Sequence, residues 1–192
     1  MKLRYLNIEY FFKALNRPYY NSREFTKFVS DYFAGDELVG AEIGVNKGEN
    51  AKNMLEMLNI KKLYLIDPFV ENDLYGDWVD RTHTAVYSLQ KYYPKIKFLF
   101  KTSKSATFYI NERLDFVYID GNHLYKHVKE DIELYWKKIR TPGILGGHDF
   151  SPNCPGVAKA VVEFAEKNNL PIYHNNGIDW WFVKEWNMKL LV

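Results

Sequence analysis

Residues 38–49, with the sequence LVGAEIGVNKGE, decide the fold of this chain. The stretch opens with a short apolar run that carries the acidic Glu42, continues through Gly44 and Gly48, and leads into an amphipathic segment. An apolar strand, a glycine-containing turn and a helix make up the first part of a βαβ unit. Glycine permits tight turns and close approach of a ligand to the start of a helix. The stretch therefore predicts a ligand-binding loop within an α/β domain.

The rest of the 192 residues repeats this alternation of apolar runs and amphipathic segments. Further strands are expected at residues 63–66, 96–100, 116–119 and 144–147. Helices are expected near residues 22–35, 54–58, 82–92, 105–110, 128–139 and 157–165. Two closing strands, at 172–173 and 180–183, flank a turn at Asn176 and Gly177 and predict a hairpin. The pattern predicts an α/β, doubly wound sheet, mostly parallel with one antiparallel strand, and helices on both faces.

The length fits a single domain. Residues 36–192 are expected to form it, and residues 1–35 an N-terminal helical extension. Three roles are open to this extension: it packs on the sheet, covers the site, or forms the face of a homodimer. The aromatic content of 17% has two explanations as well, a core filled by large side chains or a site that recognises flat or sugar-like groups.

Charge and cysteine content limit the classes of function. The formal net charge of +2 is too small to favour nucleic acid or a membrane surface as a partner. Cys154 is the only cysteine, which excludes an intrachain disulfide, a cysteine-based zinc site and an iron–sulfur cluster. A single thiol favours a reducing compartment, and we expect a cytoplasmic protein. No apolar run approaches the roughly 18 residues of a membrane span.

Acidic side chains and histidines stand where the predicted strands end. Glu42 lies at the end of the first strand, Asp67 follows the second, Asp120 the fourth, and His148 and Asp149 follow the fifth. In an open α/β sheet, ligands bind beyond the carboxyl ends of the strands. Because these ends meet at one edge, we expect the five side chains to line a single site.

The loop after the first strand differs from the common phosphate-binding loops. Asn46 stands where a dinucleotide fingerprint has its second glycine, and no Gly-Lys-Ser/Thr follows as in a P-loop. Glu42 would repel a pyrophosphate and instead suits a ligand that carries positive charge. Asp67, at the end of the next strand, is placed to accept hydrogen bonds from ribose hydroxyls. A nucleoside without phosphates but with positive charge is S-adenosylmethionine.

These motifs resemble those of class I S-adenosylmethionine-dependent methyltransferases. The loop of Glu42, Gly44 and Gly48, followed by Asp67, resembles their first two motifs. Residues 116–125, FVYIDGNHLY, and 142–149, PGILGGHD, resemble a small single-domain family with I-D-G-x-H-x-Y and G-G-x-x-x-H-D motifs. Many members of that family are associated with O-methylation of glycans or secondary metabolites. The resemblance covers roughly residues 36–185 and implies a Rossmann-like, seven-stranded sheet whose last strand is antiparallel.

The resemblance also implies where the cofactor lies. Glu42, Gly44 and Gly48 would lie by the methionine moiety, Asp67 at the ribose and Ser103 near the adenine, while Asp120 faces the active centre. The cofactor-binding residues implied in this way are Glu42, Gly44, Asn46, Gly48, Asp67, Ser103 and Asp120.

Related metal-dependent O-methyltransferases hold a divalent ion with three residues: an Asp after the fourth strand and an Asp-Asp or Asp-Asn pair after the fifth. Asp120 and Asp149 match two of these positions, whereas Phe150, at the third, cannot ligate. His148 either replaces it or points elsewhere. A site of Asp120, His148 and Asp149 would take Mg²⁺ or Mn²⁺. The same relatives use a lysine as base three residues after the first Asp, and here His123 stands at that place.

The expected reaction is O-methylation of a hydroxyl on a sugar, a glycan or a small molecule. Such a hydroxyl is a poor nucleophile unless a base or a metal removes its proton. His123 is the first candidate for the base, since an ordinary imidazole pKa of roughly 6.5 lies near working pH, and His148 is the second. Asp120 and Asp149 would hold these histidines or the metal.

Two other functions are compatible with parts of the sequence. A methyltransferase of nucleic acid or protein would share the cofactor loop, although the near-neutral charge argues against nucleic acid and the fourth strand lacks the N-P-P-Y-type motif of amino-methylating enzymes. A module that binds the cofactor without catalysis would share the fold, which does not by itself determine activity.

Overall fold

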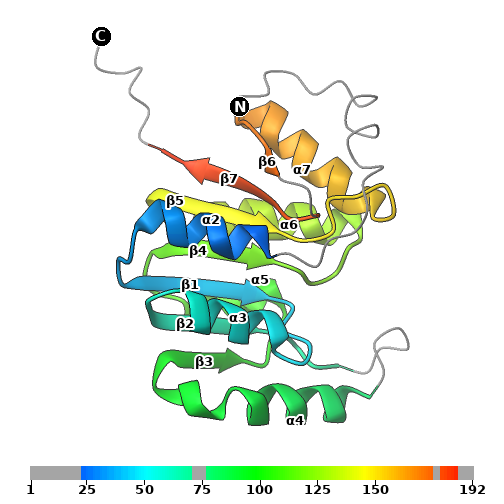
Figure 1. Cartoon of the computed structure of the whole chain (residues 1–192). Coiled ribbons are helices and arrows are strands. Elements are labelled where there is room, and N and C mark those ends of the chain that lie inside the picture. The colour runs from blue at the N-terminus through cyan, green and yellow to red at the C-terminus, as the bar shows by residue number, and fades with distance from the viewer. Residues whose placement is uncertain (1–22, 71–76, 175–177, 186–192) are drawn as a thin grey trace.

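The structure is a computed structural model, and it describes residues 23–70, 77–174 and 178–185. A seven-stranded sheet with the order β3-β2-β1-β4-β5-β7-β6 lies at its centre (Figure 1). The strands are β1 (Leu38–Ile43), β2 (Ile60–Ile66), β3 (Ile96–Leu99), β4 (Leu114–Ile119), β5 (Ile139–Gly147), β6 (Tyr173–His174) and β7 (Trp180–Lys184). Strands β1 to β5 pair in parallel, and β7 runs antiparallel to both β5 and β6. The predicted sheet with one antiparallel strand is confirmed.

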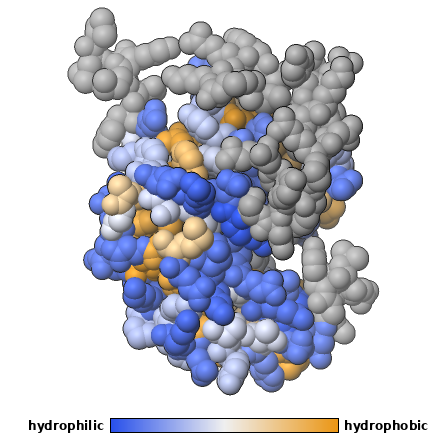
Figure 2. Space-filling view, in the orientation of Figure 1, coloured by the Kyte–Doolittle hydropathy of each residue, from blue (hydrophilic) through white to orange (hydrophobic). Residues whose placement is uncertain are grey.

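Helices cover both faces of this sheet (Figure 1). One layer holds α2 (Glu24–Phe33), α3 (Glu49–Met57) and α4 (Trp78–Ser88), and the other holds α5 (Ser103–Ala106), α6 (Tyr125–Trp136) and α7 (Pro155–Asn168). Two 3₁₀ turns complete the described elements: η1 (Gln90–Lys95) precedes β3, and η2 (Thr107–Tyr109) follows α5. The alternation of side chains along a strand separates two cores: Phe116 and Tyr118 of β4 face the first layer, Val117 and Ile119 the second. Where its atoms are coloured, the outer surface of the first layer is mostly hydrophilic (Figure 2).

Helix α2 belongs to the predicted N-terminal extension, and it packs on the sheet. Phe25 and Val29 are fully buried, and the Phe25 ring lies 5.0 Å from that of Tyr118. The amide of Phe25 donates a hydrogen bond to Oδ2 of Asp179 at 3.1 Å. Of the three roles left open for the extension, these residues take the first; residues 1–22 lie outside the described part.

Two element boundaries differ from the sequence-based prediction. Helix α4 begins at Trp78, not at residue 82, because the side chain of Asp77 caps it by accepting from the amide of Val79 at 2.7 Å. Residues 139–143 belong to β5 rather than to the end of a helix. Pro142, expected to stop that helix, lies at a register shift between β4 and β5, where a missing amide donor is tolerated.

The topology determines which side chains meet. Residues after β1, β2, β4 and β5 lie at one edge because these strands are parallel. Since β7 is antiparallel, the residue that precedes it, Asp179, reaches the same edge. Within the described residues, the helices are too short or too polar to cross a membrane.

Candidate active site

A cavity of about 1020 Å³ opens at this edge of the sheet. It is lined by all but one of the residues predicted to act in binding or catalysis. These are Glu42, Gly44, Asn46, Asp67, Ser103, Asp120, His123, His148 and Asp149. Gly48 is the exception: it stands at the start of α3 with a φ of +83° and faces Leu89, so it shapes the helix rather than the cavity wall.

The glycine loop is held against the end of β4. The amide of Asp120 donates to the carbonyl of Ile43 at 2.7 Å. Gly44, with a φ of +86°, has so little room that a Cβ would lie 2.0 Å from the carbonyl oxygen of Asp120. The need for glycine at this position therefore comes from contact with the protein's own backbone, and this contact fixes the loop relative to Asp120.

Asp67 joins two loops of the site. Its Oδ2 accepts the amides of Val45 and Asn46 at 3.0 and 3.1 Å, and its Oδ1 accepts the amide of Phe69 at 2.8 Å. A carboxylate oxygen accepts about two hydrogen bonds, so only Oδ1 has capacity left. Asp67 has room for one further donor, such as a single ribose hydroxyl.

Glu42 lies at the floor of the cavity and is 1% exposed. Its Oε1 accepts a hydrogen bond from Nδ2 of Asn50 at 2.8 Å, while its Oε2 and Oδ1 of Asn50 have no hydrogen-bond partner among the described residues. Burial raises the pKa of Glu42 to about 8. Two unpaired acceptor oxygens at the cavity floor suit a ligand that brings a positively charged donor, such as an ammonium group.

The four residues predicted to be catalytic form one cluster. Nε2 of His123 lies 3.0 Å from Oδ2 of Asp149 and 3.6 Å from Oδ1 of Asp120. Nδ1 of His148 lies 3.4 Å from Oδ1 of Asp149 and 3.8 Å from Oδ1 of Asp120. Asp149 has a φ of +59°, a conformation that costs a residue other than glycine about 1–2 kcal/mol and that is frequent at functional sites.

Charge within the cluster favours protonated imidazoles. Asp120, together with Asp149, raises the pKa of His123. Burial opposes the charged form of His148, but Asp149, Asp120 and Asp179 outweigh it, so the pKa of His148 is raised too. Burial likewise opposes the ionised form of Asp149, and the two histidines hold its pKa below the ordinary value. The cluster thus combines two bases with carboxylates that stabilise them once protonated.

Behind His148 lies a buried chain of polar groups that the sequence analysis did not identify. Asp179 is 2% exposed, accepts the hydroxyl of Tyr118 at 2.8 Å, and approaches Nε2 of His148 at 3.9 Å. Nη1 of Arg23 donates to the same hydroxyl at 3.1 Å. The sequence did carry a signal: an acidic residue directly precedes an antiparallel strand, whose start lies at the edge where the parallel strands end.

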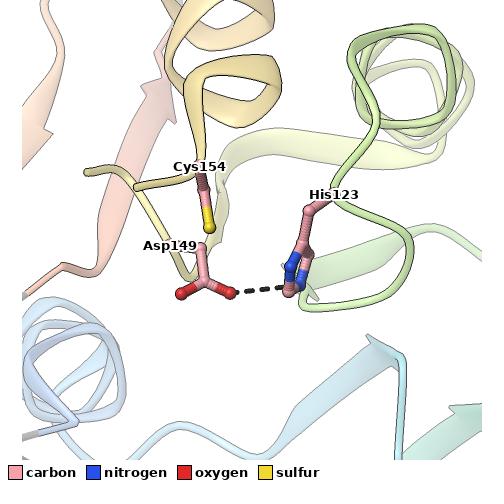
Figure 3. Close-up of side chains that lie close together, drawn as sticks. All are labelled: His123, Asp149 and Cys154. Atoms are coloured by element: carbon pink, nitrogen blue, oxygen red, sulfur yellow. Dashed lines mark ion pairs between the residues drawn. The ribbon is translucent and has the colours of Figure 1, made fainter. Parts of the chain in front are cut away.

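Two sets of possible metal ligands share Asp149. Ligand atoms of Asp120, His148 and Asp149 lie within 4.8 Å of one another, and the same holds for His123, Asp149 and Cys154. Figure 3 shows His123 from the loop before α6 and Cys154 from the start of α7 on either side of Asp149. Burial raises the pKa of Cys154, so its thiol stays protonated. The first set is the one the resemblance implies, and its hard oxygens and single imidazole fit Mn²⁺ or Mg²⁺.

Comparison with known proteins assigns the family. A family model described as "Methyltransferase domain" matches residues 41–150, more than half of the chain. The chain belongs to this methyltransferase family. A curated relative, the uncharacterized protein R132 of Acanthamoeba polyphaga mimivirus, is 27% identical in a match that covers 70% of this chain and 64% of R132. The chain therefore spans less than two thirds of that relative's length.

Solved structures share the fold of this methyltransferase domain at low identity. A Staphylococcus aureus protein assigned as a caffeoyl-CoA O-methyltransferase is 13% identical with a TM-score of 0.65, covering 93% of this chain and 90% of that one. An rRNA methylase from Streptococcus thermophilus is 13% identical with a TM-score of 0.62, and the match covers 88% of this chain and 99% of that one. SMU.1697c, a Streptococcus mutans protein assigned as a methyltransferase and solved in complex with SAH, is 13% identical with a TM-score of 0.62. The match covers 82% of this chain and 96% of that one. The Rossmann-like fold of class I S-adenosylmethionine-dependent methyltransferases is thus confirmed.

Ser103 of this methyltransferase domain, predicted to lie near the adenine, is backed by a buried carboxyl group. Asp131 of α6 lines the cavity, is 4% exposed and is hydrogen-bonded to Ser103. The hydroxyl of Tyr135 donates to the carbonyl of Ser103 at 2.8 Å. Burial raises the pKa of Asp131 to about 7, so this wall of the cavity changes charge near neutral pH.

Asp131→Asn is expected to stabilise the ligand-free protein more at pH 8 than at pH 5. The ordinary pKa of 3.8 applies to the unfolded chain, so the folded state disfavours the charged form and loses stability as the pH rises from about 4 to 7. The full effect is at most about 4 kcal/mol, at roughly 1.4 kcal/mol per pKa unit. Thermal melts at both pH values measure it, with the exposed Asp36→Asn as control. An identical gain at pH 5 and pH 8 would contradict the assignment.

Proposed function

We propose that this chain is an S-adenosylmethionine-dependent methyltransferase that methylates a hydroxyl oxygen of a sugar, a glycan or a small molecule. The observation that carries the proposal is the contact of His123 with Asp149, 3.0 Å long, on the wall of the cavity that also contains Glu42, whose Oε2 lacks a hydrogen-bond partner among the described residues. A base for a hydroxyl and an acceptor for a cation are the two features that this reaction requires of one cavity.

The cavity residues fit the cofactor. Glu42 and Asn50 would receive the ammonium group of the methionine moiety through the two unpaired oxygens. Oδ1 of Asp67 would accept one ribose hydroxyl, and Ser103 would border the adenine. When bound, S-adenosylmethionine supplies a methyl group on a sulfonium, which a nucleophile displaces in line.

The protein's own part is to bind the acceptor and remove its proton. His123 is the nearer candidate, because its ring reaches the cavity with a side-chain exposure of 31%, against 15% for His148. In a neutral His123 the Nε2–H would donate to Asp149, so Nδ1 is the nitrogen left to take the hydroxyl proton. Asp120 and Asp149 would stabilise the imidazolium that results. Asp179 and Tyr118 fix the position of His148 behind this pair.

A divalent ion would be held by Asp120, His148 and Asp149. It would lower the pKa of the acceptor hydroxyl and so assist the base. The fold neighbour assigned as a caffeoyl-CoA O-methyltransferase supports an oxygen acceptor.

A macromolecular acceptor is the second candidate, because the fold neighbours include an rRNA methylase. The net charge of +2 argues against it, since nucleic acid binding relies on many phosphate contacts. Incubation with methyl-labelled S-adenosylmethionine tests both candidates. We expect label in hydroxyl compounds and none in RNA. Cofactor binding without transfer across a broad acceptor panel would favour a module without catalysis.

Glu42→Gln is expected to weaken S-adenosylmethionine binding by roughly ten- to a hundredfold, the effect of one charge-assisted hydrogen bond. Because the pKa of Glu42 is about 8 in the ligand-free protein, a bound ammonium lowers it and about one proton is released at pH 7. Calorimetry in buffers of different ionisation enthalpy counts this proton. The exposed Glu166→Gln serves as control. Wild-type binding without proton release would refute the role of Glu42.

A further inference from the structure

Arg81, in the first turn of α4, is a buried cation on the cavity wall. It is 6% exposed. Its Nη2 donates to the carbonyl of Val70 at 2.9 Å, and its Nε has no hydrogen-bond partner. None of the ion pairs between described residues involves Arg81. Its positive charge is therefore buried without a compensating carboxylate in the part of the chain that the structure describes.

Two other arginines have an acidic group nearby. Arg140 forms an ion pair with Asp115, and Arg23 donates to the hydroxyl of Tyr118, which itself is bonded to Asp179. A buried charge without a partner is strongly destabilising, and a bound anion in the adjoining cavity removes that cost.

The surroundings of Arg81 show where such an anion would lie. Val70, whose carbonyl it contacts, follows the loop anchored by Asp67. Lys47, at the rim of the same cavity, forms an ion pair with Asp80 at 3.8 Å, so its charge is compensated. Glu42 lies on the cavity floor. The cavity therefore has an acidic floor suited to a cation, and on its wall a cation, Arg81, without an ion pair to the described residues.

We propose that Arg81 binds a carboxylate or phosphate group of a molecule that occupies the cavity. The planar guanidinium offers several donors and matches the geometry of such groups. The identity of the molecule rests on the proposed function: the group belongs either to the methionine moiety of S-adenosylmethionine or to an acidic acceptor. Both sources present the same chemistry to Arg81, and binding experiments separate them.

Calorimetry of the full chain uses three probes: S-adenosylhomocysteine, 5′-methylthioadenosine, which lacks the amino-acid end, and inorganic phosphate. Arg81→Met removes the charge and keeps much of the length, while Arg81→Lys keeps the charge. The exposed Arg113→Met is the matched control for loss of one positive charge. Thermal melts of the ligand-free variants check that each of them is folded.

A cofactor carboxylate at Arg81 predicts that Arg81→Met weakens S-adenosylhomocysteine binding at least about tenfold and leaves methylthioadenosine unchanged. If the anion belongs to an acidic acceptor, Arg81→Met should leave the binding of both S-adenosylhomocysteine and methylthioadenosine unchanged. Inorganic phosphate should then bind to the wild-type protein in complex with S-adenosylhomocysteine, and this binding should be abolished in Arg81→Met and partly retained in Arg81→Lys. If S-adenosylhomocysteine and phosphate bind wild type and Arg81→Met equally, the proposal is overturned. If the protein binds phosphate through Arg81 but does not bind S-adenosylhomocysteine, the anion site is supported and the proposed cofactor is wrong.

Discussion

His123→Ala is expected to lower the turnover number by between about a hundredfold and ten-thousandfold, the contribution of a well-placed general base. Its affinity for S-adenosylmethionine should stay close to that of the wild type, because the ring lies against Asp149 and Asp120 rather than against Glu42. The loss would therefore appear in kcat and not in cofactor binding. Methyl transfer under saturating cofactor, together with calorimetry on the same variant, measures the two quantities separately.

His83→Ala is the matched control, since His83 lies exposed on α4. His148→Ala, measured beside it, ranks the two candidate bases. Repeating the assays after chelation and with added Mn²⁺ separates the base from the ion: a base is needed under both conditions, whereas turnover that is lost on chelation and restored by Mn²⁺ shows that the ion is needed as well. Turnover within about threefold of wild type in His123→Ala would assign the base elsewhere.

The sequence determined the edge of the sheet at which the site lies, but not everything that reaches it. Acidic groups after parallel strands are visible as a pattern, so Glu42, Asp67, Asp120 and Asp149 were found by their positions. Asp179 was missed because its strand runs in the opposite direction, and the residue before such a strand, not after it, reaches the site. The direction of a strand is a property of the folded sheet. Asp179 could therefore have been found only by a prediction that located the last strand next to β5.

Arg81 was missed for a different reason. The helix predicted over residues 82–92 begins one residue after Arg81, because no apolar periodicity marks the start of α4 at Trp78, which the cap at Asp77 determines. Even with the helix in place, burial of a charged side chain depends on the neighbours that close over it. Local sequence predicts propensity and periodicity, whereas the burial of Arg81 without an ion pair to the described residues follows only from three-dimensional packing.

Gly44→Ala is expected to cost about 2–5 kcal/mol of unfolding free energy and to abolish methyl transfer. A left-handed φ of +86° costs an alanine about 1–2 kcal/mol. Overpacking adds roughly 1–3 kcal/mol, because the new Cβ would meet the carbonyl oxygen of Asp120 at 2.0 Å and the Cα of Gly121 at 2.8 Å. Both neighbours are backbone atoms and cannot rotate away, so the ends of β1 and β4 must separate and Asp120 must move.

Gly35→Ala isolates the first of these two costs. Gly35 has a φ of +94°, similar to that of Gly44, and an added Cβ would meet nothing within 4 Å. This variant should lose only about 1–2 kcal/mol and keep wild-type turnover. Urea unfolding of both variants gives the free energies, and S-adenosylhomocysteine calorimetry at a temperature where both are folded reports on the loop. Equal losses of stability and normal activity in both variants would show that the conformation of Gly44 matters and its contact with Asp120 does not, and the coupling between the cofactor loop and the catalytic carboxylate would then be wrong.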